Sequence, residues 1–115
     1  IALLYSFVIL KPTSKKLEKM VQKTYLKTKD YCKVKFAFKP ESAETVEILG
    51  LNSDWKNAVV MAKKKDGSFS IEVNLPKDSK HEFRYLVDEK LWLNEPEADG
   101  ESPNEFGGTN SYITL

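Results

Sequence analysis

The feature of this sequence that most constrains its fold is a strict alternation of apolar and polar side chains in several short segments. Tyr31–Phe38 alternates cysteine, valine and two phenylalanines with lysines and an alanine. Successive side chains of a strand point to opposite faces of a sheet, so this pattern predicts a half-buried strand. The segments 69–75 and 81–88 repeat the pattern, and Asp66-Gly67 is a strong hairpin signal.

Further strands are expected in four segments: Thr45–Leu51, Ala58–Lys64, Leu91–Leu93 and Asn110–Leu115. Turn residues separate these segments, and short strands at spacings of about 8 to 12 residues are typical of an antiparallel β-sandwich. We therefore predict an all-β chain, with residues 31–115 forming the sandwich and residues 1–30 an N-terminal extension.

The N-terminal extension begins with an apolar run, Ile1–Leu10. This run is well short of the roughly 20 residues that a membrane helix needs, and it lacks the basic start and the cleavage site of a signal peptide. No membrane partner is expected. The continuous folded pattern begins at Met20, so residues 1–19 are interpreted as an upstream extension or, alternatively, as an arm that packs on the domain or on a second copy. Lys15–Lys27 is compatible with a short helix.

The inventory of reactive side chains is small. The 115 residues correspond to one domain and contain one His and one Cys, which excludes a disulfide within the chain and any metal cluster of His and Cys. No metal and no cofactor are expected. A lone Cys32 in an alternating segment is typical of a buried thiol in a reducing cytosol, so a cytoplasmic location is expected. His81 begins a predicted strand without an obvious acidic partner.

Catalysis is not expected from the acidic segment 94–108. Its five carboxylates include Glu95, Glu97 and Asp99, and a pair of such groups serves as acid and base in glycoside hydrolysis. Glycines and prolines interrupt the segment, and its spacing differs from that of a calcium-binding EF-hand loop. We interpret this segment as a solvated loop and do not expect the chain to be an enzyme.

Charge is distributed unevenly along the chain. Residues 11–40 carry a formal charge of +8 and residues 41–115 one of −7, within a net charge of +1. The basic stretch would favour nucleic acid, but no nucleic-acid-binding motif accompanies it. A solubilising surface is therefore the better interpretation, and no nucleic-acid partner is expected.

Two tryptophans and an arginine stand apart from the predicted core pattern. Trp55 follows a polar turn, Trp92 precedes the acidic segment, and Arg84 projects from the strand face opposite the apolar one. Indole faces stack on the apolar faces of sugar rings, while guanidinium and amide groups pair with hydroxyls. The two tryptophans are predicted to serve as sugar platforms or, alternatively, as positions in the sandwich core.

Four segments together resemble family 48 carbohydrate-binding modules: VEILGLNSDW, DGSF, HEFRYLVDEKLW and NEFGGTNS. This family includes the glycogen-binding domain of the AMP-activated protein kinase β subunit and the early-set domains of branching and debranching enzymes. The resemblance covers residues 33–115 and implies an immunoglobulin-like sandwich. It also implies a glycogen- or starch-like α-glucan bound by five residues, which are Trp55, Arg84, Trp92, Phe106 and Asn110. Asn52 stands where the family motif usually has Phe.

The leading hypothesis is a non-catalytic α-glucan-binding module that stacks sugar rings on two tryptophans. The alternative is a scaffold β-sandwich that binds a protein, such as a glucan enzyme or a kinase. In that case the apolar run and the lysines of the N-terminal arm would mediate contact with a partner or a homodimer. An enzyme fragment acting on glucans is a third hypothesis.

Overall fold

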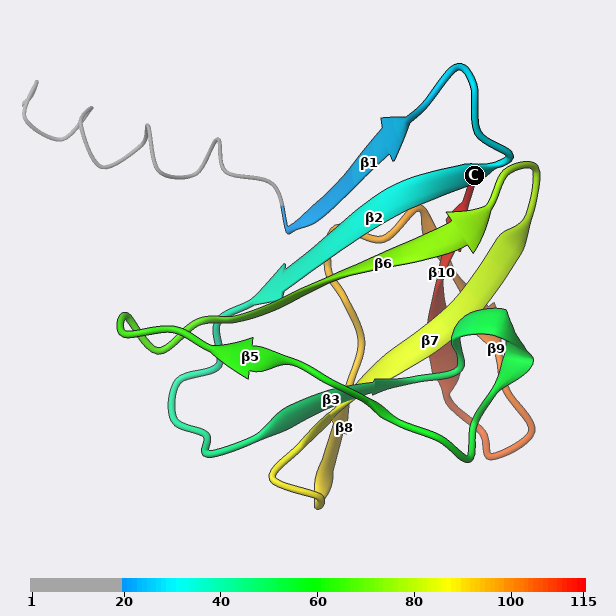
Figure 1. The fold of residues 1–115 in the computed structure, drawn as a ribbon. Helices are drawn as coiled ribbons and strands as arrows, with labels where there is room; N and C mark the ends of the chain where they lie inside the picture. The colour runs from blue at the N-terminus through cyan, green and yellow to red at the C-terminus, as the bar shows by residue number, and fades with distance from the viewer. Residues whose placement is uncertain (1–19) are drawn as a thin grey trace, which may run out of the picture.

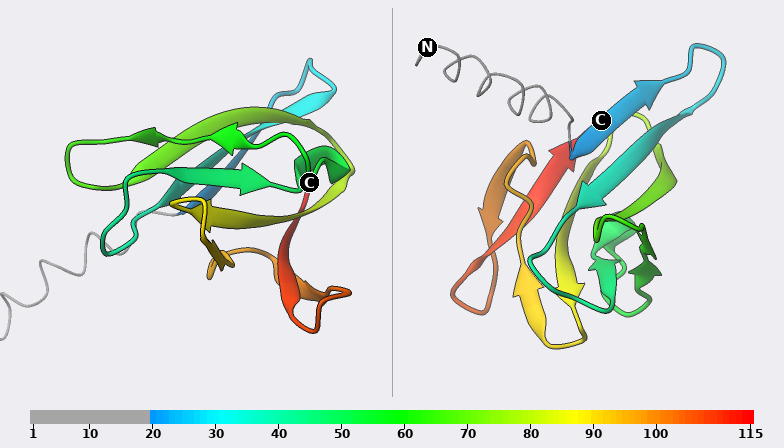
Figure 2. Two further views of the ribbon diagram at one scale, coloured as in Figure 1. Left: turned by 90° about the horizontal axis from the view of Figure 1, so that it is seen from below. Right: turned by 90° about the vertical axis from the view of Figure 1, so that its left-hand side faces the viewer.

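The computed structural model describes residues 20–115, which form two packed antiparallel sheets (Figures 1 and 2). The strands are β1 (Val21–Tyr25), β2 (Tyr31–Phe38), β3 (Val46–Leu49), β4 (Val59–Val60), β5 (Ala62–Lys63), β6 (Phe69–Pro76), β7 (Lys80–Val87), β8 (Leu91–Leu93), β9 (Gly100–Pro103) and β10 (Thr109–Thr114). The first sheet has the order β1-β2-β6-β5, and the second β4-β3-β7-β10-β9, with β8 also paired to β7. This confirms the predicted antiparallel sandwich.

The core lies between the two sheets and is built from the apolar faces that the alternation predicts. Phe36 of β2 meets Phe83 of β7 edge to face, with ring centroids 5.1 Å apart, and Phe38 stacks on Tyr85 at 4.5 Å. Cys32 is completely buried and is a free thiol, as expected. Because the inward positions of β7 fill the core, the residues between them are left on the outer face of the second sheet.

The N-terminal strand differs from the sequence prediction. The segment Lys15–Lys27 was compatible with a short helix, whereas Val21–Tyr25 forms strand β1 and pairs with β2 along its whole length. Lys23 holds this strand to the second sheet, because its Nζ lies 2.7 Å from a carboxylate oxygen of Asp99 and donates to the carbonyl of Thr114. The first sheet therefore begins within residues 1–30. Residues 1–19, with the apolar run, lie outside the described residues.

The strand predicted over Ala58–Lys64 is divided between the two sheets. Its first half is β4, which pairs with β3, and its second half is β5, which pairs with β6. Met61 lies between them, is 3% exposed and donates its N–H to the carbonyl of Val46. The apolar side chain of Met61 enters the core at this point, which explains the break.

The acidic segment 94–108 is not a uniformly solvated loop. Glu95 is 2% exposed, and its carboxylate accepts hydrogen bonds from the hydroxyl of Tyr85 at 2.6 Å and the N–H of Glu97 at 2.8 Å. These bonds satisfy the buried acceptors, while burial raises the pKa of the Glu95 carboxyl. Gly100–Pro103 forms strand β9, which pairs with β10. Within residues 20–115, no helix has the length and apolar character to span a bilayer.

Candidate functional site

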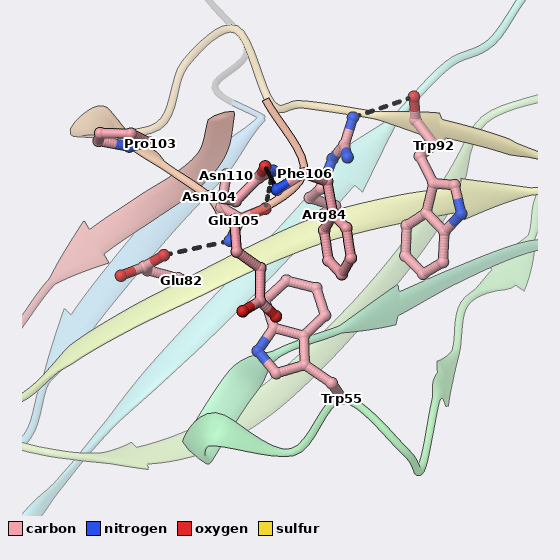
Figure 3. A pocket seen from close by; sticks show the side chains of 9 residues that line it. All are labelled: Trp55, Glu82, Arg84, Trp92, Pro103, Asn104, Glu105, Phe106 and Asn110. Atoms are coloured by element: carbon pink, nitrogen blue, oxygen red, sulfur yellow. Dashed lines mark hydrogen bonds between the residues drawn. The ribbon is translucent and has the colours of Figure 1, made fainter. Parts of the chain in front are cut away.

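A depression of about 790 Å³ lies on the outer face of the second sheet (Figure 3). All five residues selected from the sequence line it, together with four others: Trp55, Glu82, Arg84, Trp92, Pro103, Asn104, Glu105, Phe106 and Asn110. They come from the turn after β3, from β7 and β8, and from the segment β9–β10. The fold thus brings together residues that are up to 55 positions apart in the sequence.

Trp55 is positioned by the tight turn that follows β3. Gly50 has a φ of +109°, and the Trp55 ring lies so close to it that an added Cβ would meet ring carbons at 2.6 and 2.8 Å. Asp54 fixes the next residues, because its carboxylate accepts the N–H groups of Lys56 and Asn57. The Asn57 hydrogen bonds, the largest cause, lower the pKa of Asp54. Trp55 remains 41% exposed, so its ring is held but open to a ligand.

Asn52, which stands where the family motif has Phe, supports this turn in a different way. Its φ is +59°, a left-handed conformation that asparagine tolerates better than most residues. Its N–H donates to Nδ1 of His81 at 3.0 Å, and Nε2 of His81 lies 2.7 Å from the hydroxyl oxygen of Ser79. His81 is 5% exposed and burial lowers its pKa. His81 therefore serves as a neutral structural acceptor beneath the turn.

Arg84 and Trp92 form the part of the depression on β7 and β8. The guanidinium carbon lies 5.9 Å from the centre of the indole, and Nη2 is 3.5 Å from the carbonyl oxygen of Trp92. The Nε of Arg84 is buried without a hydrogen-bond partner among the described residues. Trp92 is 41% exposed. The two tryptophans therefore lie at the surface, not in the core position that the sequence left open.

Asn104 organises the loop that carries Phe106. Its side-chain oxygen accepts hydrogen bonds from the backbone N–H groups of Phe106 at 2.9 Å and of Gly108 at 3.0 Å. Its backbone N–H donates to the carbonyl of Gly108. Its amide nitrogen donates to the side-chain oxygen of Asn110 at 3.2 Å. Phe106 is 87% exposed at the tip of this loop. One residue thus fixes both the aromatic tip and the orientation of the Asn110 amide.

Glu82 completes the polar side of the depression. The amide of Asn110 donates to its carboxylate at 3.2 Å, which continues the chain of hydrogen bonds that begins at Asn104. Four lining residues were not expected from the sequence: Glu82, Pro103, Asn104 and Glu105. The alternation of β7 places Glu82 on the same face as Arg84, which is the signal that could have identified it. The pattern N-x-F-G-G, in which an asparagine precedes a turn, is the corresponding signal for Asn104.

The arrangement is suited to binding rather than to proton transfer or nucleophilic attack. Figure 3 shows the rings of Trp55, Trp92 and Phe106 grouped around Arg84. Amide, guanidinium and carboxylate groups also line the depression and supply both donors and acceptors. Within residues 20–115, no group of three or more His, Cys, Asp or Glu side chains is placed to hold a metal ion. Aromatic faces and polar groups in one depression match a polyhydroxylated ligand.

Known proteins similar to this chain point in the same direction. Residues 32–115 match the family described as the glycogen recognition site of AMP-activated protein kinase. The signal transduction protein MDG1 of Saccharomyces cerevisiae, strains YJM789 and RM11-1a, is 34% identical over an alignment of 83 residues, and the alignment covers 69% of this chain and 22% of MDG1. The chain thus spans about a fifth of the length of this relative.

The fold is also similar to that of a solved structure. A candidate alpha amylase from Salmonella typhimurium superposes with a TM-score of 0.60 over 86% of this chain and 15% of that chain, at 16% sequence identity. At this identity the likeness shows the fold alone.

Proposed function

Because the chain belongs to the family of glycogen recognition domains of AMP-activated protein kinase, we propose that it is a non-catalytic module that binds α-glucans of the glycogen and starch type. Carbohydrate binding is the function of this family, and the finer proposal concerns the residues that carry it. The glucan lies across Trp55 and Trp92, with Phe106 inserted against the sugar rings and Arg84 and Asn110 hydrogen-bonded to hydroxyls.

The single observation that carries this proposal is the exposure of both indoles in one depression. Trp55 and Trp92 are each 41% exposed, although tryptophan side chains are highly buried on average. Local structure holds both rings in place, Gly50 beneath Trp55 and Arg84 beside Trp92. Rings that are fixed before the ligand arrives lose little conformational entropy on binding.

A modest affinity follows from this arrangement. If each indole covers about 80 Å² of apolar sugar surface at about 25 cal/mol/Å², the two rings contribute about 4 kcal/mol. Hydrogen bonds to hydroxyls add about 1 kcal/mol each, since water satisfied those hydroxyls before binding. After the cost of ordering the glucan, the expected Kd lies between about 10 μM and 1 mM.

Tryptophan fluorescence tests the proposal directly, because the chain contains two tryptophans and both line the depression. Titration with maltoheptaose should change the emission with a Kd in the range of about 10 μM to 1 mM. Cellohexaose, a β-linked glucan of similar size, is the matched control and should bind more weakly. No change of emission up to about 10 mM maltoheptaose, tenfold above the weakest affinity expected, would contradict the proposal.

Two further expectations remain proposals. We propose a cytoplasmic location on the basis of the buried free thiol of Cys32. A protein partner or a homodimer formed through the N-terminal arm stays a prediction, since residues 1–19 lie outside the described residues.

A further inference from the structure

A row of side chains crosses the outer face of the second sheet beside the depression. Val60 of β4 is the cross-strand partner of Glu47 on β3. Glu47 also pairs with Leu86 on β7, and Leu86 in turn pairs with Trp92 on β8. Partners opposite each other in an antiparallel ladder point to the same face of the sheet. The row therefore runs from the rim of the depression to the edge strand β4. With strands about 4.8 Å apart, it is about 14 Å long.

The exposure and chemistry of this row resemble those of the depression. Val60 is 64% exposed and Trp92 is 41% exposed, with Leu86 and Glu47 half-buried between them. Among residues 20–115, nothing donates a hydrogen bond to the Glu47 carboxylate or forms an ion pair with it. Apolar side chains flank a free acceptor on both sides. The C–H faces of sugar rings can pack on the apolar side chains, and sugar hydroxyls can donate to the carboxylate.

We propose that Val60, Glu47 and Leu86 form a further α-glucan subsite, which continues the path of a bound chain from Trp92 toward β4. The inference rests on the proposed function. The row is continuous with the depression through Trp92, whose indole lies over β7 in Figure 3. A stable protein interface covers about 800 Å² on each partner, far more than two exposed apolar side chains and one carboxylate supply. A sugar chain needs only such a narrow strip.

Ligands of different length separate this subsite from the main site. Maltotriose and the closed ring of β-cyclodextrin engage the depression, whereas maltoheptaose also reaches the row. In the intact chain, maltoheptaose should bind about tenfold more tightly than maltotriose by calorimetry. Glu47→Ala and Val60→Ser should each remove most of this gain and leave the affinities for maltotriose and β-cyclodextrin unchanged. Glu47→Gln, which retains an acceptor, should recover part of it.

The matched control is Glu72→Ala, which removes an exposed strand carboxylate from β6 of the first sheet and should alter no affinity. The inference is overturned, and the proposed function survives, if all ligands bind but Glu47→Ala and Val60→Ser leave the chain-length gain intact. If no glucan binds to the intact chain, the proposed function fails and the subsite with it. A dimer in sedimentation equilibrium that Val60→Ser dissociates would identify the row as a contact between copies and overturn the subsite.

Discussion

Gly50→Ala tests how the fold aims Trp55. The φ of +109° at this position is a conformation that side chains with a Cβ rarely adopt. The added Cβ would also meet the carbonyl oxygen of Glu82 and two carbons of the Trp55 ring, at 2.6 and 2.8 Å. The carbonyl belongs to the middle strand of the second sheet and cannot move freely. We therefore expect the Trp55 ring to be displaced and the turn at Gly50 to be strained.

The size of the effect follows from two contributions. Backbone strain at a positive φ costs about 1–3 kcal/mol, and overpacking costs about 1–3 kcal/mol more. Gly67→Ala is the matched control, because its φ is +90° but nothing lies within 4 Å of the added Cβ. Gly50→Ala should lower the free energy of unfolding by about 2 kcal/mol more than Gly67→Ala. In a domain of this size, that difference lowers Tm by about 10 °C more.

Differential scanning calorimetry measures the stability of the two variants. Titration with β-cyclodextrin, well below both Tm values, measures the affinity of the site. Gly67→Ala should bind as the intact chain does. Gly50→Ala should bind several-fold more weakly, because its Trp55 ring is displaced. Equal stability of the two variants would refute the close contact around Gly50. Unchanged affinity in Gly50→Ala would refute the idea that this glycine orients the ring.

Three further predictions concern the loop and the buried groups. Asn104→Ala should weaken β-cyclodextrin binding about tenfold by calorimetry, because the Phe106 loop must then be ordered on binding at a cost of about 1.4 kcal/mol. In urea titrations, the free energy of unfolding should be constant between about pH 7 and 9 and decrease as the pH falls from about 6.5 to 5. The unfolded chain binds a proton at His81 more tightly than the folded chain, in which burial lowers this pKa. Glu95→Ala should lower the free energy of unfolding by about 3 kcal/mol in denaturant titrations, since the Tyr85 hydroxyl loses its buried acceptor.

Matched variants check each of these expectations. Asn104→Asp keeps the loop acceptor but loses the donor to Asn110, so it should recover part of the affinity, and an equal loss in both variants would assign the effect to the Asn110 contact instead. His81→Gln should remove the decrease in stability between about pH 6.5 and 5, above the ordinary titration range of carboxyls, and a decrease that persists in this window would assign it to other groups. Adding Tyr85→Phe to Glu95→Ala should restore about 1 kcal/mol, because the unpaired hydroxyl is gone. No restoration would contradict the buried hydrogen bond.

The sandwich was predictable from the sequence because period-two alternation directly reports which face of a strand is buried. That signal located β2, β6 and β7, and the resemblance to family 48 modules is confirmed by the family match over residues 32–115. The signal failed at β1, where an exposed edge strand alternates poorly, and at Met61, where one segment changes sheets. It also failed at Glu95, whose burial depends on partners distant in sequence.

The sequence predicts the site residues that are chemically unusual, but not those that only hold other site residues in place. Trp55 and Trp92 stood out as aromatic side chains beside polar turns, and the structure brings them into one depression. Whether they were core or surface residues could not be decided from local pattern, because it depends on how β8 pairs with β7. Asn104 and Glu82 were missed, since their roles consist of hydrogen bonds made after the loop and sheet have formed.

The most direct test of the central claim is calorimetric titration of the intact chain and of Trp92→Ala with β-cyclodextrin. The intact chain should bind with a Kd between about 10 μM and 1 mM, and the variant about thirtyfold more weakly, because one platform of about 2 kcal/mol is lost. Tyr25→Ala, which removes another exposed aromatic ring on β1, should bind normally. Equal affinity of the intact chain and a folded Trp92→Ala would contradict a glucan-binding site in this depression.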